Sequence, residues 1–118
     1  MSPYATAAYI KYMSVVTESR QEVIERIRGL TPKLRARGVR KLALFGSFAR
    51  NTHHAESDVD LLVEFAPGKK NFDNFMAVCD LLEEKLQRRV ELLTRESLSP
   101  HIGPHILQEA QDVVAAAD

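Results

Sequence analysis

The chain has 118 residues, 45% of them hydrophobic and 27% charged, and a formal net charge of zero at pH 7. These values are typical of one soluble globular domain, and the length excludes two domains of ordinary size. No apolar stretch approaches the roughly 18 residues that span a bilayer, and the N-terminus has no signal-peptide pattern, so we expect no membrane association. The single cysteine, Cys79, excludes an internal disulfide and favours a cytoplasmic location.

Positive charge is concentrated in the first half of the chain. Between Arg26 and Arg50 there are eight lysines and arginines and no acidic residue. Such a run can be a solvated helix face, or it can attract a polyphosphate or an acidic partner. The sequence leaves both interpretations open.

Residues 1–18 are predicted to be an N-terminal extension of uncertain structure. Their apolar residues fit a short amphipathic helix, a flexible tail, or additional sequence before a start at Met13. Residues 19–118 are predicted to form a single domain.

Two helix starts are predicted before the first strand. Ser19, followed three residues later by Glu22, fits a capping box. Thr31 and Pro32 indicate a second start, with the threonine as N-cap and the proline at the first helical position. The alternative is one helix that is kinked at Pro32.

The middle of the chain predicts two strands joined by a short polar segment. An apolar run predicts a strand over residues 39–45, which ends at Gly46 and Ser47. A short helix up to Arg50 and a polar loop follow, and a second apolar run predicts a strand over residues 58–65. If the two strands are antiparallel, the end of the first lies beside the start of the second.

The second half predicts a helix over residues 72–86 with Asn71 as its cap, a strand over residues 89–93, and a last helix from about residue 104 to residue 114. The element order predicts an α+β fold, a small mixed β-sheet packed with helices. The apolar residues expected near one face of the first of these helices are Phe72, Phe75, Met76, Cys79, Leu82 and Leu86.

Asp58 and Asp60 are the strongest candidates for a functional site. Residues i and i+2 of a strand point to the same face, so the two carboxylates are expected side by side. Like charges repel at that distance, and a cation would relieve the repulsion. Oxygen ligands suit a hard cation such as Mg²⁺, which completes its coordination shell with phosphate oxygens and water.

Gly46 and Ser47 are the candidates for the opposite side of this site. A glycine lets a phosphate approach the backbone closely and can adopt positive φ, and the serine adds a hydroxyl. Arg50, one turn further along the short helix, could contact a phosphate through its planar guanidinium. The arrangement suits a metal-bound nucleoside triphosphate.

A Gly-Ser pair, ten further residues and then DVD followed by LLVEF resembles the signature of the DNA polymerase β-like nucleotidyltransferase superfamily. More narrowly, FGSFAR and SDVDLLVEF look like the minimal nucleotidyltransferases (the MNT family), which are the antitoxin partners of HEPN-domain toxins. The resemblance covers roughly residues 20 to 115, and it is most specific in this central motif.

The resemblance implies roles for individual residues. Asp58 and Asp60 match the paired metal ligands of the family. Glu91 matches its third carboxylate, which is more often Asp, and could serve as a metal ligand or as general base on the acceptor hydroxyl, or be only a polar strand residue. Asn51 stands where the family commonly has Gly, and asparagine tolerates the left-handed conformation that a turn there requires.

The function implied by the resemblance is Mg²⁺-dependent transfer of AMP from ATP to a hydroxyl. The acceptor would be a tyrosine of a cognate HEPN ribonuclease toxin, which the transfer silences, so the expected assembly is a hetero-oligomer. A chain that is little more than a catalytic core favours an acceptor that helps to build the site. The alternatives are an antitoxin that acts by binding alone, and a transferase that acts on a small molecule or on RNA ends. Binding of nucleic acid is otherwise not expected.

Overall fold

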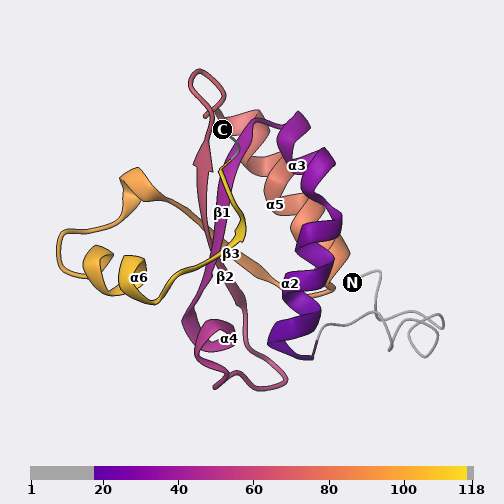
Figure 1. Cartoon of the computed structure of the whole chain (residues 1–118), viewed down its shortest axis with the longest axis vertical. Coiled ribbons are helices and arrows are strands. Elements are labelled where there is room, and N and C mark those ends of the chain that lie inside the picture. The colour runs from indigo at the N-terminus through magenta and orange to yellow at the C-terminus, as the bar shows by residue number, and fades with distance from the viewer. Residues whose placement is uncertain (1–17, 117–118) are drawn as a thin grey trace.

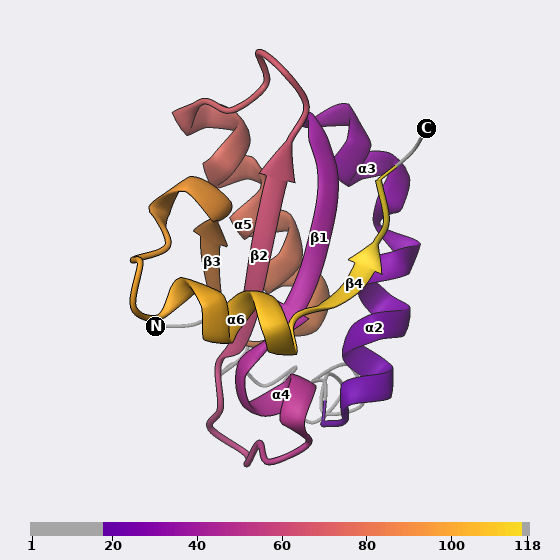
Figure 2. The same cartoon turned by 60° about the vertical axis from the view of Figure 1, so that its left-hand side comes forward.

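The fold is organised around a four-stranded mixed sheet, shown in two orientations in Figures 1 and 2. The computed structural model describes residues 18–116. Its strands are β1 (Val39–Phe45), β2 (Val59–Phe65), β3 (Val90–Thr94) and β4 (Gln111–Val114). Their order across the sheet is β3-β2-β1-β4. β1 is antiparallel to both of its neighbours, whereas β3 runs parallel to β2 at the other edge.

Helices cover the two faces of the sheet unequally. They are α2 (Arg20–Gly29), α3 (Thr31–Ala36), α4 (Gly46–Arg50), α5 (Phe72–Leu86) and α6 (Gly103–Glu109), with a short 3-10 helix, η3, over Arg95–Ser97. Figures 1 and 2 show α2, α3 and α5 against one face, while α6 crosses the other. The predicted α+β class with a small mixed sheet is confirmed. Within residues 18–116, no helix has the length and apolar character needed to cross a membrane.

The alternation of strand side chains divides the core into two parts. On β1, Leu42 belongs to the large cluster under α2 and α5, whereas Ala43 belongs to a small cluster under α6. On β2, Leu62 belongs to the small cluster, so Asp60, two residues earlier on the same strand, points to that thinly covered face. The small cluster comprises Ala43, Phe45 and Leu62, with Leu93, Leu98, Ile106 and Ala110 packed against it.

The predicted start of α2 is confirmed, because the backbone N–H of Glu22 donates to Ser19 Oγ over 3.1 Å. Two helices are present in place of one kinked helix, and they are separated at Leu30. Thr31 as N-cap was wrong. It is already helical, and its hydroxyl donates back to the carbonyl oxygen of Arg28 over 2.7 Å, so its Oγ does not cap α3.

α5 has the predicted bounds, and Asn71 caps it by accepting a hydrogen bond of 2.8 Å from the backbone N–H of Asn74. The predicted apolar face was wrong at its N-terminal end, since Phe72 is 76% exposed and Met76 40% exposed. At about 100° per residue, Met76 lies nearly opposite Val78, which is one of the residues that pack on the sheet. The buried side chains of α5 are Val78, Leu82 and Leu86.

The predicted last helix was wrong in its second half. α6 ends at Glu109, and Ala110 is extended, with φ −64° and ψ 133°. The following residues form β4, which pairs with β1 so that Leu42 lies opposite Val114. β-Branched valines suit an edge strand, and pairing with β1 supplies hydrogen-bond partners that a lone helical turn would not gain. Val113 and Val114 are accordingly buried.

The predicted extension over residues 1–18 lies outside the described residues except for Glu18. The division of the chain at residue 19 therefore stays a prediction.

The strand assignment at the C-terminal end can be tested by replacing Val114 with alanine. Alanine favours helix over strand, so an exposed helical turn would tolerate it, whereas β4 would lose buried methyl groups. We expect the free energy of unfolding to fall by roughly 1–3 kcal/mol, measured by urea denaturation. Gln111→Ala, at an exposed position of the same strand, should change it by less than about 0.5 kcal/mol. Equal stability of the two variants would contradict the strand.

Candidate active site

The turn after β1 brings the backbone of Gly46 against the side chain of Asp60. Gly46 adopts φ +75°, a conformation that L side chains rarely adopt. A Cβ added at Gly46 would overlap the carboxylate of Asp60, approaching its Cγ to 2.8 Å. Phe45, the residue before the turn, lies directly opposite Asp60 in the β1–β2 pairing. Two separate constraints, the backbone conformation and the close approach of a carboxylate, therefore require glycine here.

Asp60 and Glu91 lie side by side on adjacent parallel strands. They are register partners between β2 and β3, and the side chain of Glu91 is near enough to Asp60 to raise its pKa. Burial, together with the neighbouring Glu91 and the negative charge of Asp58, raises the pKa of Asp60 to about 6, while Arg50 opposes the shift. The structure thus brings together the predicted carboxylates, with repulsion between them that is only partly compensated.

Asp58 directly precedes β2, is half-buried, and acts on Asp60 through its charge. The donor set of Asp58, Asp60 and Glu91 is all oxygen and suits a hard divalent cation, which would relieve the repulsion around Asp60. The three side chains are too far apart to coordinate one ion together. Among residues 18–116, no group of three or more His, Cys, Asp or Glu side chains is close enough to hold a metal ion. The residues fit such an ion in chemistry, and their side chains would have to move closer together to hold it.

Arg50 and the backbone N–H of Gly46 together hold a carboxylate. The side chain of Glu109, the last residue of α6, accepts a hydrogen bond of 2.8 Å from Gly46 N–H at its Oε1. Nη1 of Arg50 lies 3.0 Å from both of its carboxylate oxygens. Gly46 and Arg50, two of the three residues predicted to bind phosphate, therefore form an anion-binding arrangement, and a carboxylate of the same chain occupies it.

Glu109 was missed by sequence reasoning. It lies 63 residues from Gly46 along the chain, and its place depends on where α6 crosses the sheet. No local pattern could have indicated it.

Ser47 and Asn51 lie in the same turn, and the role predicted for the Ser47 hydroxyl stays a prediction. Ser47 is half-buried in the first turn of α4, next to Gly46. Asn51 ends α4 in the left-handed conformation, with φ 59° and ψ 34°, so the expectation that asparagine can replace glycine there is confirmed. Behind the turn, the ring of His53 stacks on Phe48 with centroids 4.0 Å apart, which fixes the loop against the core.

Comparison with known proteins assigns the family. Residues 21–113 match the family described as the nucleotidyltransferase domain. The chain belongs to this family. It is a nucleotidyltransferase, and the matched range contains every carboxylate and phosphate-binding candidate described above.

Two relatives resemble this nucleotidyltransferase over most of their own length. A candidate protein adenylyltransferase of Methanocaldococcus jannaschii is 41% identical over 87 residues, which cover 74% of this chain and 92% of that protein. The protein adenylyltransferase MntA of Thermococcus cleftensis is 32% identical over 96 residues, covering 81% of this chain and 86% of that protein.

Solved structures agree with the family assignment. One described as a candidate minimal nucleotidyltransferase has a TM-score of 0.71 at 26% identity, covering 80% of this chain and 95% of that chain. A complex of a tri-AMPylated HEPN toxin with an MNT antitoxin of Shewanella oneidensis has a TM-score of 0.56 at 20% identity, covering 82% of this chain and 73% of that chain. At that identity the second likeness shows the fold alone. The recognition made from the central motif is confirmed.

The charge on Asp60 should make the metal-free protein less stable as the pH rises. Because the pKa of Asp60 in the folded state, about 6, is above its ordinary value of 3.8, the folded protein binds this proton more tightly than the unfolded chain. Stability from this group is complete below about pH 4 and is lost as the pH rises through about 6. We expect Asp60→Asn to raise the melting temperature by a few degrees at pH 7.5 in EDTA, and by much less at pH 4.

The control for this experiment is Asp80→Asn, which removes an exposed carboxylate on α5. It should give no comparable gain at pH 7.5. A lower melting temperature for Asp60→Asn at pH 7.5 would mean that the Asp60 carboxylate stabilises the fold.

The destabilisation caused by a Cβ at Gly46 can be compared with that at another glycine. Gly68 has nearly the same φ, +77°, but a Cβ there would meet nothing within 4 Å. Gly68→Ala should therefore cost only the left-handed conformation, about 1–2 kcal/mol, whereas Gly46→Ala adds the overlap with Asp60. In an Asp60→Ala background most of the extra cost at Gly46 should disappear, because only the Cβ of residue 60, at 3.0 Å, remains close. A double-mutant cycle in urea measures this difference. Additive effects of Gly46→Ala and Asp60→Ala would contradict the contact.

Proposed function

We propose that the protein transfers AMP from ATP to a tyrosine hydroxyl of a cognate HEPN-domain toxin, uses Mg²⁺, and so acts as an antitoxin. The observation that carries this proposal is the pairing of Asp60 with Glu91 directly beside the anion-binding group of Gly46 and Arg50. One side of the turn is suited to a cation and the other to an anion. A metal-bound triphosphate has both.

The phosphate groups of ATP would be held by the chain's own donors. Gly46 N–H and the Arg50 guanidinium already bind a carboxylate, and a phosphate oxygen makes the same charge-assisted hydrogen bonds. The Ser47 hydroxyl, on the residue after Gly46, would add a third donor. Held in this way, the triphosphate would have its reacting phosphorus next to the carboxylates of β2 and β3.

The carboxylates would hold the metal and handle the proton. Asp58, Asp60 and Glu91 are the residues that would ligate Mg²⁺, which when bound neutralises charge on the triphosphate. Glu91 is exposed on the edge strand β3, where an acceptor hydroxyl can reach it. Glu91 would take the hydroxyl proton as the oxygen bonds to the α-phosphorus and the bond to pyrophosphate breaks.

Two relatives support a protein as the acceptor. The M. jannaschii and T. cleftensis proteins are named as protein adenylyltransferases, and the S. oneidensis complex pairs an MNT antitoxin with an AMPylated HEPN toxin. An obligatory protein partner also agrees with the exposed position of Glu91 at the sheet edge.

A second candidate function is neutralisation of the toxin by binding alone. It is favoured by one observation, the carboxylate of Glu109 in the position proposed for phosphate. Under this alternative the carboxylates would have no part in protection.

Glu91→Gln should separate the two candidates. If Glu91 accepts the proton, this variant should lower the rate of toxin adenylylation by roughly a hundredfold or more, measured by intact mass after incubation with ATP and Mg²⁺. Glu91→Asp, which has the residue commoner in the family, should keep substantial activity. Asp58→Asn combined with Asp60→Asn should abolish the transfer.

The same variants should be assayed for rescue of cells that express the toxin. Glu96→Gln serves as the control, because Glu96 is an exposed glutamate that pairs with Lys70 away from the site. Loss of rescue together with loss of toxin modification would support the enzyme. Full rescue by the Glu91→Gln and double Asn variants, with unmodified toxin, would leave the binding antitoxin.

A further inference from the structure

The carboxylate of Glu109 satisfies the donors that a phosphate would need. It accepts from Gly46 N–H over 2.8 Å and from Arg50 Nη1 over 3.0 Å at each oxygen. A backbone N–H has a single hydrogen to donate, so it cannot serve this carboxylate and a phosphate oxygen at full strength together. The two anions would also repel each other at that distance.

The position of the Glu109 side chain is determined by the position of α6 on the sheet. It is the last residue of α6, and the next residue, Ala110, packs with Ile106 against the small cluster of Ala43, Phe45 and Leu62. α6 also contacts α4, the helix that begins at Gly46. The Glu109 side chain is therefore held in the site by the way α6 rests on the sheet.

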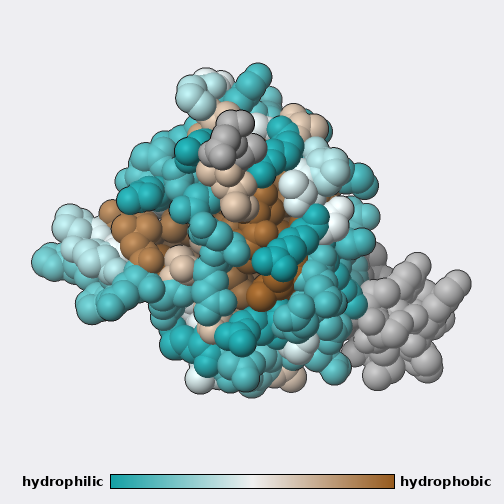
Figure 3. Space-filling model, viewed as in Figure 1, coloured by the Kyte–Doolittle hydropathy of each residue, from teal (hydrophilic) through white to brown (hydrophobic). Residues whose placement is uncertain are grey.

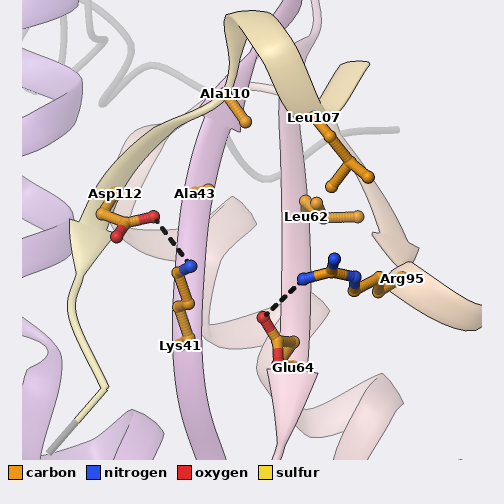
Figure 4. Close-up of a pocket in the computed structure, with 8 residues that line it drawn as sticks. All are labelled: Lys41, Ala43, Leu62, Glu64, Arg95, Leu107, Ala110 and Asp112. Atoms are coloured by element: carbon orange, nitrogen blue, oxygen red, sulfur yellow. Dashed lines mark ion pairs between the residues drawn. The ribbon is translucent and has the colours of Figure 1, made fainter. Parts of the chain in front are cut away.

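The space between α6 and the sheet is incompletely filled by side chains. A hollow of about 210 Å³ lies beside it on the sheet face, as Figure 4 shows, with Leu107 and Ala110 on one side and Ala43 and Leu62 on the floor. Ion pairs of Lys41 with Asp112 and of Arg95 with Glu64 flank the hollow, at 3.5 Å and 3.8 Å. In the space-filling view of Figure 3, apolar surface is visible in this region between α6 and the sheet.

A helix that rests on a small cluster beside a hollow can shift at modest cost, because few apolar contacts hold it. The exposed fractions of Ile102, 59%, and Leu107, 39%, agree with such a lightly packed helix. The Glu109 side chain can therefore leave the anion position at modest cost, as long as β4, whose Val113 and Val114 belong to the main core, stays paired with β1.

We propose that Glu109 is an internal competitor for the phosphate groups of the nucleotide. Its carboxylate occupies the position of the triphosphate in the free protein and has to leave when the nucleotide binds, with a shift of α6. The proposal rests on the nucleotide site of the proposed function. The measured affinity for nucleotide is therefore lower than the intrinsic affinity of the open site. The dissociation constant is the intrinsic one divided by the fraction of free molecules in which Glu109 has left the position.

Two variants of Glu109 distinguish occupation from simple charge repulsion. Glu109→Gln removes the charge and weakens the contact with Arg50. Glu109→Asp keeps the charge but is one methylene shorter, by roughly 1.5 Å, so it cannot reach both donors from the same helix position. Glu96→Gln is the matched control for loss of one glutamate and one ion pair.

The measurement is titration calorimetry of the full chain with ATP and Mg²⁺, repeated with inorganic tripolyphosphate. We expect both Glu109 variants to bind both probes about five- to tenfold more tightly than the original chain, and Glu96→Gln to bind them with unchanged affinity. In the original chain, saturation with ATP should also speed hydrogen exchange of the backbone amides of α6 and of Ala110 after it, whose N–H donates to the carbonyl oxygen of Ile106.

Several results would overturn the proposal. Equal affinities in the original chain and both Glu109 variants would show that Glu109 does not compete, while leaving the nucleotide site intact. Tighter binding in Glu109→Gln alone would reduce the effect to long-range repulsion. Weaker binding in both would make Glu109 a residue that positions Arg50 for the nucleotide. If none of the proteins binds either probe, the nucleotide site itself fails, and the competitor with it.

Discussion

The contact between the bare α-carbon of Gly46 and the carboxylate of Asp60 governs the geometry of the whole site. It requires β1 to end where β2 begins, which the antiparallel pairing of Phe45 with Asp60 provides. At the same residue, the N–H of Gly46 donates to the carboxylate of Glu109 at the end of α6. Because β3 pairs with β2 in parallel register, the same strand position brings Glu91 to Asp60. The residues around this close approach therefore come from β1, β2 and β3 and from α4 and α6.

The electrostatics of the site oppose folding, and the rest of the molecule has to offset them. Asp60 is partly buried beside like charges, and this raises its pKa to about 6. The stabilising contribution comes from the large cluster on the other face of the sheet. Leu61 and Val63, which follow Asp60 on β2 and point to that other face, are completely buried there. A strand that is apolar on one side and acidic on the other therefore serves stability and chemistry at once.

The local part of this arrangement could be predicted from the sequence. The first strand has its predicted bounds, and the second begins one residue later than predicted, at Val59. These strands, the left-handed Asn51 and the cap at Asn71 depend on neighbours within a few residues, so propensity and spacing are sufficient for them. The family could likewise be recognised from one compact motif, residues 45–65, and the match over residues 21–113 confirms it.

What could not be predicted depends on contacts between distant segments. Residues 111–114 form β4 because β1 offers an unpaired edge, and a helical pattern of apolar residues is equally consistent with that stretch. The exposure of Phe72 depends on the angle at which α5 crosses the sheet, which the spacing of apolar residues does not define. The position of Glu109 depends on the pairing of β4 with β1, since α6 leads directly into β4.

The carboxylate held by Gly46 and Arg50 also describes the kind of small molecule that could inhibit this enzyme. An inhibitor for this position does not need a phosphate: a planar group with one negative charge can accept the same three hydrogen bonds. Such a group has a much smaller desolvation penalty than a triphosphate.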